Sequence, residues 1–584
     1  MKKRCLFNFV LLGFVATANL CFCQTTTSYS VYKLENKIGQ EVASSSLQDN
    51  STAENISIIT NDRGSALMLK ASYTAVNNTV KYTSNGNTSR FTTENIDTAF
   101  SIGGSFPCSK NGSIKMRELL VSFWNKAGRP AFIPSAINGN RVNIEVMGKE
   151  KDPLHNTDLT VIAIKDDLDE VFWIDDKGSS IYLSTCDAEG DKREVINDNY
   201  QAHFNTFNHQ SNQYLIKKYL ADNKELGKAF DDIAIVGGNI IDVTDSGKVR
   251  YNSMLLLKNG KIDYIGDIDK AIIPAGAQVI DASNKFLIPG LWNMHVHLFH
   301  PQYLRNELLS GVTTVRDMGN EFDFITALKE AVSAKNFPAP HILNAGLLDG
   351  NSSNSLGIMR ATNEAEIKAN VKKYHDAGFN QIKIYSYIKK NDFITIVKEA
   401  RLYNMDVVGH LPIGYTVGYF IDNGMNSISH IHYFMNNLKF GGKDLKADNK
   451  ALLDKMIEKK IYLDPTLNVY TLTGDKKIPF YNILIKLFFD YGIPIVAGTD
   501  NEGTVITEIQ SYAKLGINPL NAIRAATIIP ATLMKLNAQS GSIEKGKDAD
   551  ILLLNANPLL NMDALNNIDT IIKGQLIIKK MADK

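Results

Sequence analysis

The chain has 584 residues, of which 44% are hydrophobic and 21% are charged, a composition that excludes a disordered, collagen-like or polytopic membrane protein. Its length predicts several domains. Lys and Arg number 63 and Asp and Glu number 62, so the formal charge is only +1 and we expect no nucleic-acid partner.

Residues 1–23 have the pattern of a secretory signal peptide. Basic residues at positions 2–4 precede an apolar run over 5–18, and Cys21 and Cys23 occupy the small-residue positions of a cleavage signal. Because a membrane span needs roughly 20 apolar residues, we expect an exported protein, periplasmic or extracellular, with no integral span in its mature part. Attachment of lipid to Cys21 or Cys23 is an alternative, which the bulky residues before them disfavour.

Residues 24–211 predict an amino-terminal β-rich domain, followed by a helical linker over 212–232. Short β-favouring runs such as NISII, VNIEVM and SSIYLS alternate with turn clusters such as SNGN and DDKGSS. Cys108 and Cys186 lie in this domain and would form either a disulfide or two free thiols. The domain has no tight group of His, Cys and acidic residues in sequence, so we expect it to pack or to present substrate.

Residues 233–286 and 541–584 are both β-rich and predict one composite β-sandwich that draws strands from two separate segments. In the first segment, Asn259-Gly260 between two apolar runs is a strong signal for a two-residue hairpin turn.

Residues 287–540, between these segments, alternate short apolar strands with amphipathic helical stretches. The predicted strands are GLWNMHVH, TTVRD, HILNAG, QIKIYSY, DVVGHL, SISHIHY, IYLDPTL and PIVAGTD. Eight such strands in about 250 residues predict a (β/α)8 TIM barrel, which makes the whole chain an α/β protein with a flanking sandwich and an additional β-rich domain.

Polar residues that could bind metal end several of the predicted barrel strands, where barrel enzymes carry their chemistry. A spacing of two places both histidines of the first strand on one face. A lysine that ends the fourth strand is unusual, because burying an uncompensated charge is unfavourable. The candidate metal ligands are His295, His297, Lys383, His410, His430 and Asp500.

These residue types suit two divalent cations. Zinc is the predicted metal, because Zn²⁺ accepts imidazole nitrogen and carboxylate oxygen as ligands. The lysine must then become an anion. Carboxylation of Lys383 by CO₂ would form a carbamate whose two oxygens can each bind one ion. The two ions would share a hydroxide, generated at neutral pH, that can attack a carbonyl.

The motifs resemble those of the amidohydrolase superfamily, and within it the imidazolonepropionase-like and Xaa-Pro dipeptidase-like branch. The matching stretches are GLWNMHVH, GVTTVRDMG, QIKIY, GHLP, SISH, AGTD and the tail GSIEKGKDADILLL. The similarity spans about residues 233–579, and the region before it resembles an amino-terminal extension of some exported bacterial members.

The resemblance implies a metal-dependent hydrolase that cleaves a carbon–nitrogen bond in an amide, a cyclic amide or a short peptide. It implies His295, His297 and Asp500 as ligands of the more buried ion, His410 and His430 as ligands of the second, and Lys383 as the bridge. Asp500 would take a proton from the nucleophile and pass it to the leaving nitrogen. Because imidazolonepropionase itself uses one metal and no bridging lysine, Lys383 favours the two-metal, dipeptidase-like members.

Three neighbouring residues are candidates for substrate contacts, although each could equally be an ordinary packing or loop residue: Tyr385, His300 and His432. The substrate is expected to be a small molecule or a short peptide, and a homo-oligomer is left open. Two other functions compete with the first, namely an inactive barrel that serves as a binding protein, and an ester or lactone hydrolase that uses the same site.

Overall fold

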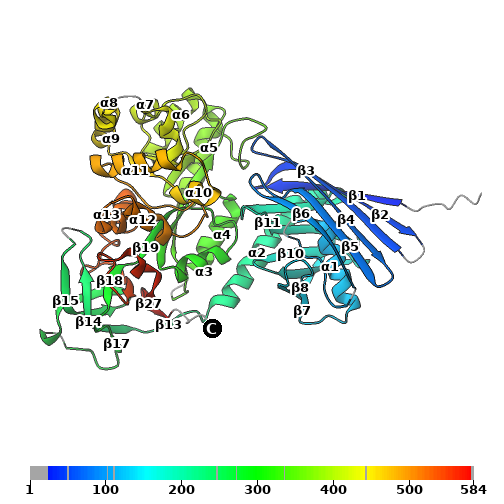
Figure 1. Cartoon of the computed structure of the whole chain (residues 1–584), viewed down its shortest axis with the longest axis horizontal. Helices are drawn as coiled ribbons and strands as arrows, with labels where there is room; N and C mark the ends of the chain where they lie inside the picture. Colours follow the sequence, from blue (N-terminus) through cyan, green and yellow to red (C-terminus); the bar gives the residue numbers. More distant parts are fainter. Residues whose placement is uncertain are drawn as a thin grey trace, which may run out of the picture.

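The computed structural model describes residues 24–48, 51–101, 103–109, 112–244, 247–270, 272–333, 336–440 and 444–579. The predicted signal peptide lies outside these residues. Figure 1 shows a long antiparallel sheet, a helix-covered barrel and a smaller sheet beside the barrel. The three parts follow one another along the chain, except that the last strands return to the smaller sheet.

Within the described part of the chain, the amino-terminal sheet has 12 strands in the order β6-β5-β4-β3-β2-β1-β12-β11-β10-β9-β8-β7. They are β1 (Gln24–Lys33), β2 (Asn36–Gln48), β3 (Ser51–Asp62), β4 (Ser65–Val76), β5 (Thr79–Asn87), β6 (Thr93–Ser101), β7 (Phe132–Pro134), β8 (Arg141–Lys151), β9 (Asp158–Lys165), β10 (Asp169–Ile174), β11 (Ser180–Cys186) and β12 (Lys192–Asn197). Strands β1–β6 lie side by side in chain order, and so do β7–β12. The antiparallel pairing of β1 with β12 joins these two runs into one sheet. Cys108 and Cys186 are both free thiols.

Two helices accompany this sheet. Helix α1 (Ile114–Lys126), which the sequence analysis did not anticipate, starts where the Ser113 hydroxyl accepts a hydrogen bond from the Met116 amide and packs its apolar face on the sheet. Helix α2 (Phe204–Asn223) follows the 3-10 helix η1 (Asp198–His203). It begins before the expected linker range of 212–232 and ends within it.

The smaller sheet has nine strands among the described residues, in the order β13-β28-β27-β26-β18-β14-β15-β16, with β17 beside β14. They are β13 (Lys228–Ala229), β14 (Asp232–Ile241), β15 (Val249–Lys258), β16 (Lys261–Asp267), β17 (Gln278–Asp281), β18 (Phe286–Pro289), β26 (Asp550–Leu554), β27 (Ile568–Lys573) and β28 (Leu576–Lys579). The predicted hairpin is confirmed: β15 and β16 pair antiparallel, and Asn259 and Gly260 between them have φ of 51° and 76°.

The barrel has seven parallel strands in chain order within the described residues. They are β19 (Leu291–Val296), β20 (Val312–Asp317), β21 (His341–Leu348), β22 (Gln381–Ile384), β23 (Asp406–Gly409), β24 (Ser427–Ser429) and β25 (Tyr462–Asp464). All residues of β19 and β20 are buried, as expected for parallel strands that are covered on both faces.

The expected eighth strand, PIVAGTD, closes the barrel without forming a regular ladder. On one side the Leu463 amide donates to the Pro494 carbonyl at 2.9 Å, and on the other the Met294 amide donates to the Ala497 carbonyl at 2.9 Å. The segment therefore joins the last strand to the first, and its carboxyl end, at Asp500, reaches the same rim as the ends of the other strands. This arrangement confirms the predicted barrel.

Helices cover the outside of the barrel (Figure 1). They are α3 (Gln302–Leu309), α4 (Phe322–Val332), α5 (Glu364–Asp376), α6 (Lys390–Leu402), α7 (Val417–Asp422), α8 (Leu445–Asp448), α9 (Lys450–Glu458), α10 (Leu467–Thr473), α11 (Ile478–Tyr491), α12 (Val505–Lys514), α13 (Pro519–Arg524) and α14 (Ile528–Leu533). Helix α5 shows how the sequence sets their limits: the Asn363 side chain accepts from the Glu366 amide at its start, and Gly378 has a φ of 73° just beyond its end.

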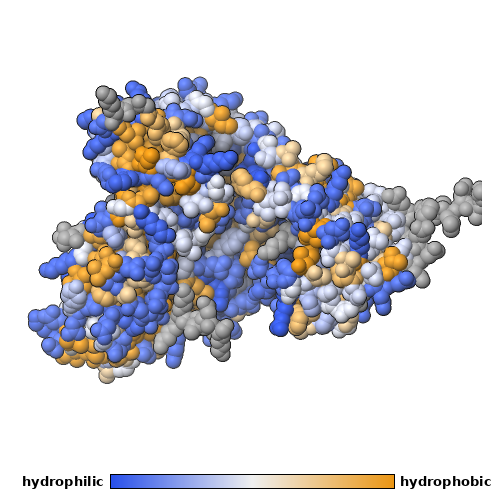
Figure 2. Space-filling view, viewed as in Figure 1, coloured by the Kyte–Doolittle hydropathy of each residue, from blue (hydrophilic) through white to orange (hydrophobic). Residues whose placement is uncertain are grey.

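The face shown in Figure 2 is mainly hydrophilic, and apolar residues gather on it over the helices around α9 and α11. Phe480 and Ile483 on α11 are 46% and 50% exposed. Across the described residues, no helix combines the length and the apolar character that a membrane span requires. The homo-oligomer stays a prediction.

Candidate active site

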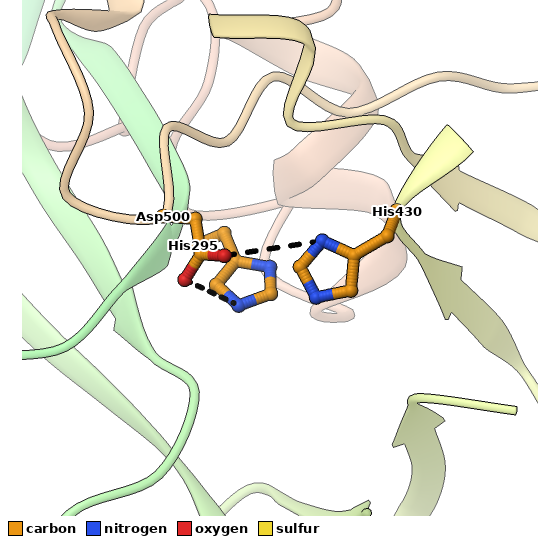
Figure 3. Close-up of side chains that lie close together, drawn as sticks. All are labelled: His295, His430 and Asp500. Carbon is orange, nitrogen blue, oxygen red and sulfur yellow. Dashed lines mark ion pairs between the residues drawn. The ribbon is translucent and has the colours of Figure 1, made fainter. Parts of the chain in front are cut away.

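The six predicted metal ligands meet at the carboxyl end of the barrel. Figure 3 shows His295, from β19, and His430, which follows β24, pointing toward Asp500. An oxygen of Asp500 lies 3.4 Å from Nε2 of His295 and 3.2 Å from Nε2 of His297, and its other oxygen lies 3.9 Å from Nδ1 of His430. One carboxylate thus approaches three imidazoles that come from the ends of two strands, β19 and β24.

The remaining two predicted ligands complete this cluster. Nζ of Lys383, from β22, lies 3.3 Å from Nε2 of His295, and Nε2 of His410 lies 2.9 Å from Nε2 of His430. Lys383 is 1% exposed. The structure therefore brings together side chains that are separated by up to 205 positions in the sequence, from His295 to Asp500.

The outward nitrogens of two histidines are held by the protein, which leaves the inner nitrogens for a ligand. Nδ1 of His295 lies 2.6 Å from Oδ2 of Asp464, and Nδ1 of His297 donates to the Gly319 carbonyl at 2.8 Å. Such bonds fix the tautomer and the orientation of a metal-binding imidazole. Both Nε2 atoms consequently face the shared space beside Asp500.

Asp464 was missed by the sequence analysis, although it ends a predicted strand in the same way as the other site residues. It is fully buried, and besides His295 it contacts Nη2 of Arg316 at 3.4 Å. Burial raises the pKa of Asp464 to about 6, while Arg316 opposes that rise. Arg316 points into the barrel, where it contacts Asp464, the Met294 carbonyl and Gln381. It therefore supports the site through its contact with Asp464.

The backbone at two site residues adopts a conformation that non-glycine residues seldom take. His430 has a φ of 71° and Asp500 has a φ of 53°. Such strain persists only where surrounding contacts impose it, and it concentrates at functional sites. Here the His430 amide donates to the Asp464 carbonyl at 2.7 Å and the Asp500 amide donates to the His295 carbonyl at 2.7 Å, so both side chains are held toward the cluster.

The electrostatic environment favours the ligand forms of these groups. Burial lowers the pKa of His295, His410 and His430 well below the ordinary value, which keeps the imidazoles neutral with a free electron pair. Burial also lowers the pKa of Lys383 to about 8. Burial alone would raise the pKa of Asp500, but the neighbouring histidines hold it well below its usual range.

The donor set fits a divalent cation. His295, His430 and Asp500 each offer a ligand atom, and these atoms lie within 4.8 Å of one another. Nδ1 of His410 is buried and has no hydrogen-bond partner among the described residues. Neutral imidazoles around a carboxylate are the ligands that zinc and similar ions take in proteins.

A cavity of about 240 Å³ opens over the cluster. Two of the three candidate substrate residues line it: Tyr385, whose ring stacks on His410 at a centroid distance of 4.1 Å, and His432, whose Nδ1 lies 2.6 Å from the Tyr470 hydroxyl. Arg63 and Arg90 from the amino-terminal sheet also line the cavity, and the sequence analysis had no signal for them.

His300 does not line the cavity, contrary to its expected role as a substrate contact. Its Nε2 donates to the Asp169 carbonyl of the amino-terminal sheet at 3.0 Å, and its Nδ1 accepts from the Gln302 amide at 3.1 Å. With both ring nitrogens bonded and the side chain buried, His300 joins the barrel to the sheet instead.

Curated relatives are similar to much of the carboxy-terminal part of the chain. An adenine deaminase from Bacillus subtilis (strain 168) is 22% identical over 360 residues, which cover 59% of this chain and 57% of that protein, little more than half its length. An imidazolonepropionase from Psychromonas ingrahamii is 23% identical over 376 residues, which cover 54% of this chain and 90% of that protein.

Among solved structures, that of a Xaa-Pro dipeptidase with bound methionine in the active site has a TM-score of 0.51 and 22% sequence identity, and the match covers 60% of this chain and 100% of that one. At this identity the likeness bears on the fold. Residues 286–577, half of the chain, match the amidohydrolase family, which confirms the resemblance that the motifs indicated. The chain belongs to the amidohydrolase family.

Proposed function

We propose that the protein is a metal-dependent hydrolase that cleaves a carbon–nitrogen bond in an amide, a cyclic amide or a short peptide. The observation that carries the proposal is the meeting of His295, Lys383 and Asp500 with three further histidines at one end of the barrel. Two divalent ions, with zinc as the predicted metal, would occupy this cluster. Bound ions of this kind acidify a water molecule and polarise a carbonyl.

Asp500 is the proposed proton carrier. Its low pKa keeps it deprotonated at neutral pH, so that it can accept the proton of an attacking water. The side chain of Asp500 is 24% exposed toward the cavity, whereas that of His295 is fully buried. It can therefore reach both the nucleophile and the leaving nitrogen, to which it would return the proton.

Lys383 is the proposed bridge between the ions. Carboxylation requires the neutral amine, and burial shifts the pKa of Lys383 toward the physiological range. The carbamate would convert a buried cation into an anion beside neutral imidazoles. This change removes the unfavourable burial of an ammonium group that His295, at 3.3 Å, cannot neutralise.

Elemental analysis of the active protein, together with a Lys383→Ala variant, tests the proposal. We expect about two equivalents of divalent metal per chain, loss of the second ion and of most activity in the variant, and partial recovery when short carboxylic acids replace the carbamate. Lys389→Ala, at an exposed position six residues along, is the matched control. One equivalent in fully active enzyme, or unchanged turnover of Lys383→Ala, would contradict the bridging role.

Matched amide and ester substrates separate the proposed function from the two alternatives. An ester or lactone hydrolase would turn over only the ester, and an inactive barrel would turn over neither while keeping its metal. Export to the periplasm or the extracellular space also remains a proposal, which amino-terminal sequencing of the mature protein tests: we expect a start near position 24.

A further inference from the structure

The amino-terminal sheet is fixed over the mouth of the barrel by buried polar contacts. Nζ of Lys192, from β12, lies 2.6 Å from an oxygen of Glu321 in the barrel, and both side chains are 1% exposed. His300 donates to the Asp169 carbonyl, and the Tyr303 hydroxyl donates to the Gly190 carbonyl at 3.0 Å. Separating the sheet from the barrel would leave these buried polar groups without partners, which costs free energy. The contacts therefore hold the sheet in place against the barrel.

Three turns at one end of this sheet reach the cavity over the metal cluster. Arg63 lies between β3 and β4, Arg90 lies between β5 and β6, and Glu189 and Asp191 lie between β11 and β12. All four line the same cavity as His410 and Asp500. The wall of the catalytic cavity is thus built partly from residues outside the part of the chain that matches the family.

The two arginines are held in place through one edge of each guanidinium group. Nε of Arg63 donates to Asp62 at 2.8 Å and its Nη2 to Asp191 at 2.7 Å. Nε and Nη2 of Arg90 both donate to Glu189, at 3.1 and 2.6 Å. Nη1 of Arg90 has no protein acceptor among the described residues, and a guanidinium has five N–H donors, so part of the Arg90 group remains available to a ligand.

Arg63 also connects the sheet to the metal cluster. It lines the same cavity as Tyr385, whose ring stacks on His410 at a centroid distance of 4.1 Å. The guanidinium therefore shares this cavity wall with a side chain that contacts a proposed metal ligand. A substrate whose scissile bond lies at the ligand cluster would occupy the same cavity as Arg63 and Arg90.

We propose that Arg63 and Arg90 form a subsite for a carboxylate, through which the amino-terminal sheet selects substrates with a free carboxylate beyond the scissile carbon–nitrogen bond. The inference rests on the proposed function and narrows its substrate class to dipeptides and N-acyl amino acids. The planar fork of arginine matches a carboxylate with two parallel hydrogen bonds. The cavity of about 240 Å³ suits a small molecule of this kind.

Acidic groups in the same wall do not remove this preference. Glu189 accepts from Arg90 at 2.6 Å and from Arg63 at 3.4 Å, and Asp191 accepts from Arg63 at 2.7 Å. Asp62, Asp187 and Asp191 surround Nζ of Lys33 at 2.6 to 2.8 Å, and Arg63 also donates to Asp62 and Asp191, so two cations already engage that group. Glu502 also lines the cavity and would favour a positively charged group, so the experiment must compare substrates of different charge.

The test uses the metal-loaded full chain and pairs of substrates, dipeptides and N-acetyl amino acids, each as the free acid and as the carboxyl-terminal amide. We expect the wild type to prefer the acid, and Arg90→Gln to lower kcat/KM for the acid at least about tenfold while changing it for the amide less than about threefold. Arg90→Lys keeps the charge without the fork and should lie between. Arg141→Gln, at a cation–π contact with Phe132 away from the cavity, is the control.

Arg63 is more buried, so Arg63→Gln is interpreted only with a melting curve that matches the wild type. If Arg90→Gln lowers kcat/KM equally for acid and amide, or if the wild type prefers the amide, the carboxylate subsite is wrong. If the wild type cleaves neither member of any pair, the proposed function fails instead. Cleavage of both at equal rates, unaffected by Arg90→Gln, overturns only the subsite.

Discussion

Two clusters of ligand-type side chains lie in different regions of this molecule, and they solve the same electrostatic problem differently. In the barrel, atoms of His295, His430 and Asp500 lie within 4.8 Å of one another, and in the amino-terminal sheet so do oxygens of Asp62, Asp187 and Asp191. The second cluster encloses the ammonium of Lys33. In the barrel, Lys383 lies 3.3 Å from His295, and burial lowers the pKa of this lysine to about 8.

The comparison teaches that close ligand atoms do not by themselves identify a metal site. The aspartates raise the pKa of Lys33 against the opposing effect of its burial, so that the chain carries its own cation there. The barrel instead surrounds Asp500 with imidazoles, and Asp464 and the Gly319 carbonyl bind the outer nitrogens of His295 and His297. Imidazoles held in this way offer electron pairs to a metal cation, whereas the aspartates of the sheet already hold an ammonium.

The strongest way to break this contrast is to neutralise Asp500. We expect Asp500→Asn to lower kcat by about 10³-fold or more, because it removes the proton carrier and one metal ligand. The melting temperature should change little, since the side chain faces the cavity. Steady-state kinetics with elemental analysis measure both effects, and Asp376→Asn on the exposed face of α5 is the control. Activity within tenfold of the wild type would refute the role of Asp500.

Removing the internal cation of the sheet should act on stability. Lys33→Met leaves three buried carboxylates without their ammonium, and we expect it to lower the free energy of unfolding by about 3–5 kcal/mol. Lys81→Met breaks an exposed pair with Asp97 at 3.6 Å and should cost less than about 1 kcal/mol. Denaturant titration compares the two variants. Equal losses of unfolding free energy in the two variants would show that Lys33 does not neutralise the aspartates. The metal content of the protein should stay unchanged in both variants.

The junction between the two regions should weaken in acid. Burial lowers the pKa of His300 from 6.5 to about 4, so the folded protein holds this ring neutral while the unfolded chain protonates it. The contribution of His300 to the free energy of unfolding is therefore present above pH 6.5. It is lost as the pH falls toward 4, and the total loss is about 3 kcal/mol. Unfolding free energies measured across this range should fall less steeply for His300→Gln. Parallel curves for the two proteins would argue against the assignment.

Local sequence patterns predicted the elements in which residue types repeat with a simple period. The apolar runs that end in His297, Lys383, His410 and Asp500 had the alternation with helices that a parallel barrel requires, and the barrel is confirmed. The Asn259-Gly260 turn was predicted for a similar reason, since few residue pairs accept two consecutive positive φ angles. Helix α1 was missed because it is a single helix among strand and turn signals.

The sequence alone determined which side chains stand at the end of each barrel strand. Strand geometry places these side chains at the rim, whatever surrounds the barrel. Only the tertiary structure decided which side chains orient them and what closes the cavity. Asp464 could not be separated from other buried acids, His300 turned out to join two parts of the molecule, and Arg63 and Arg90 reach the site from turns more than 200 positions before His295. Long-range packing brings these groups together, and no local spacing records it.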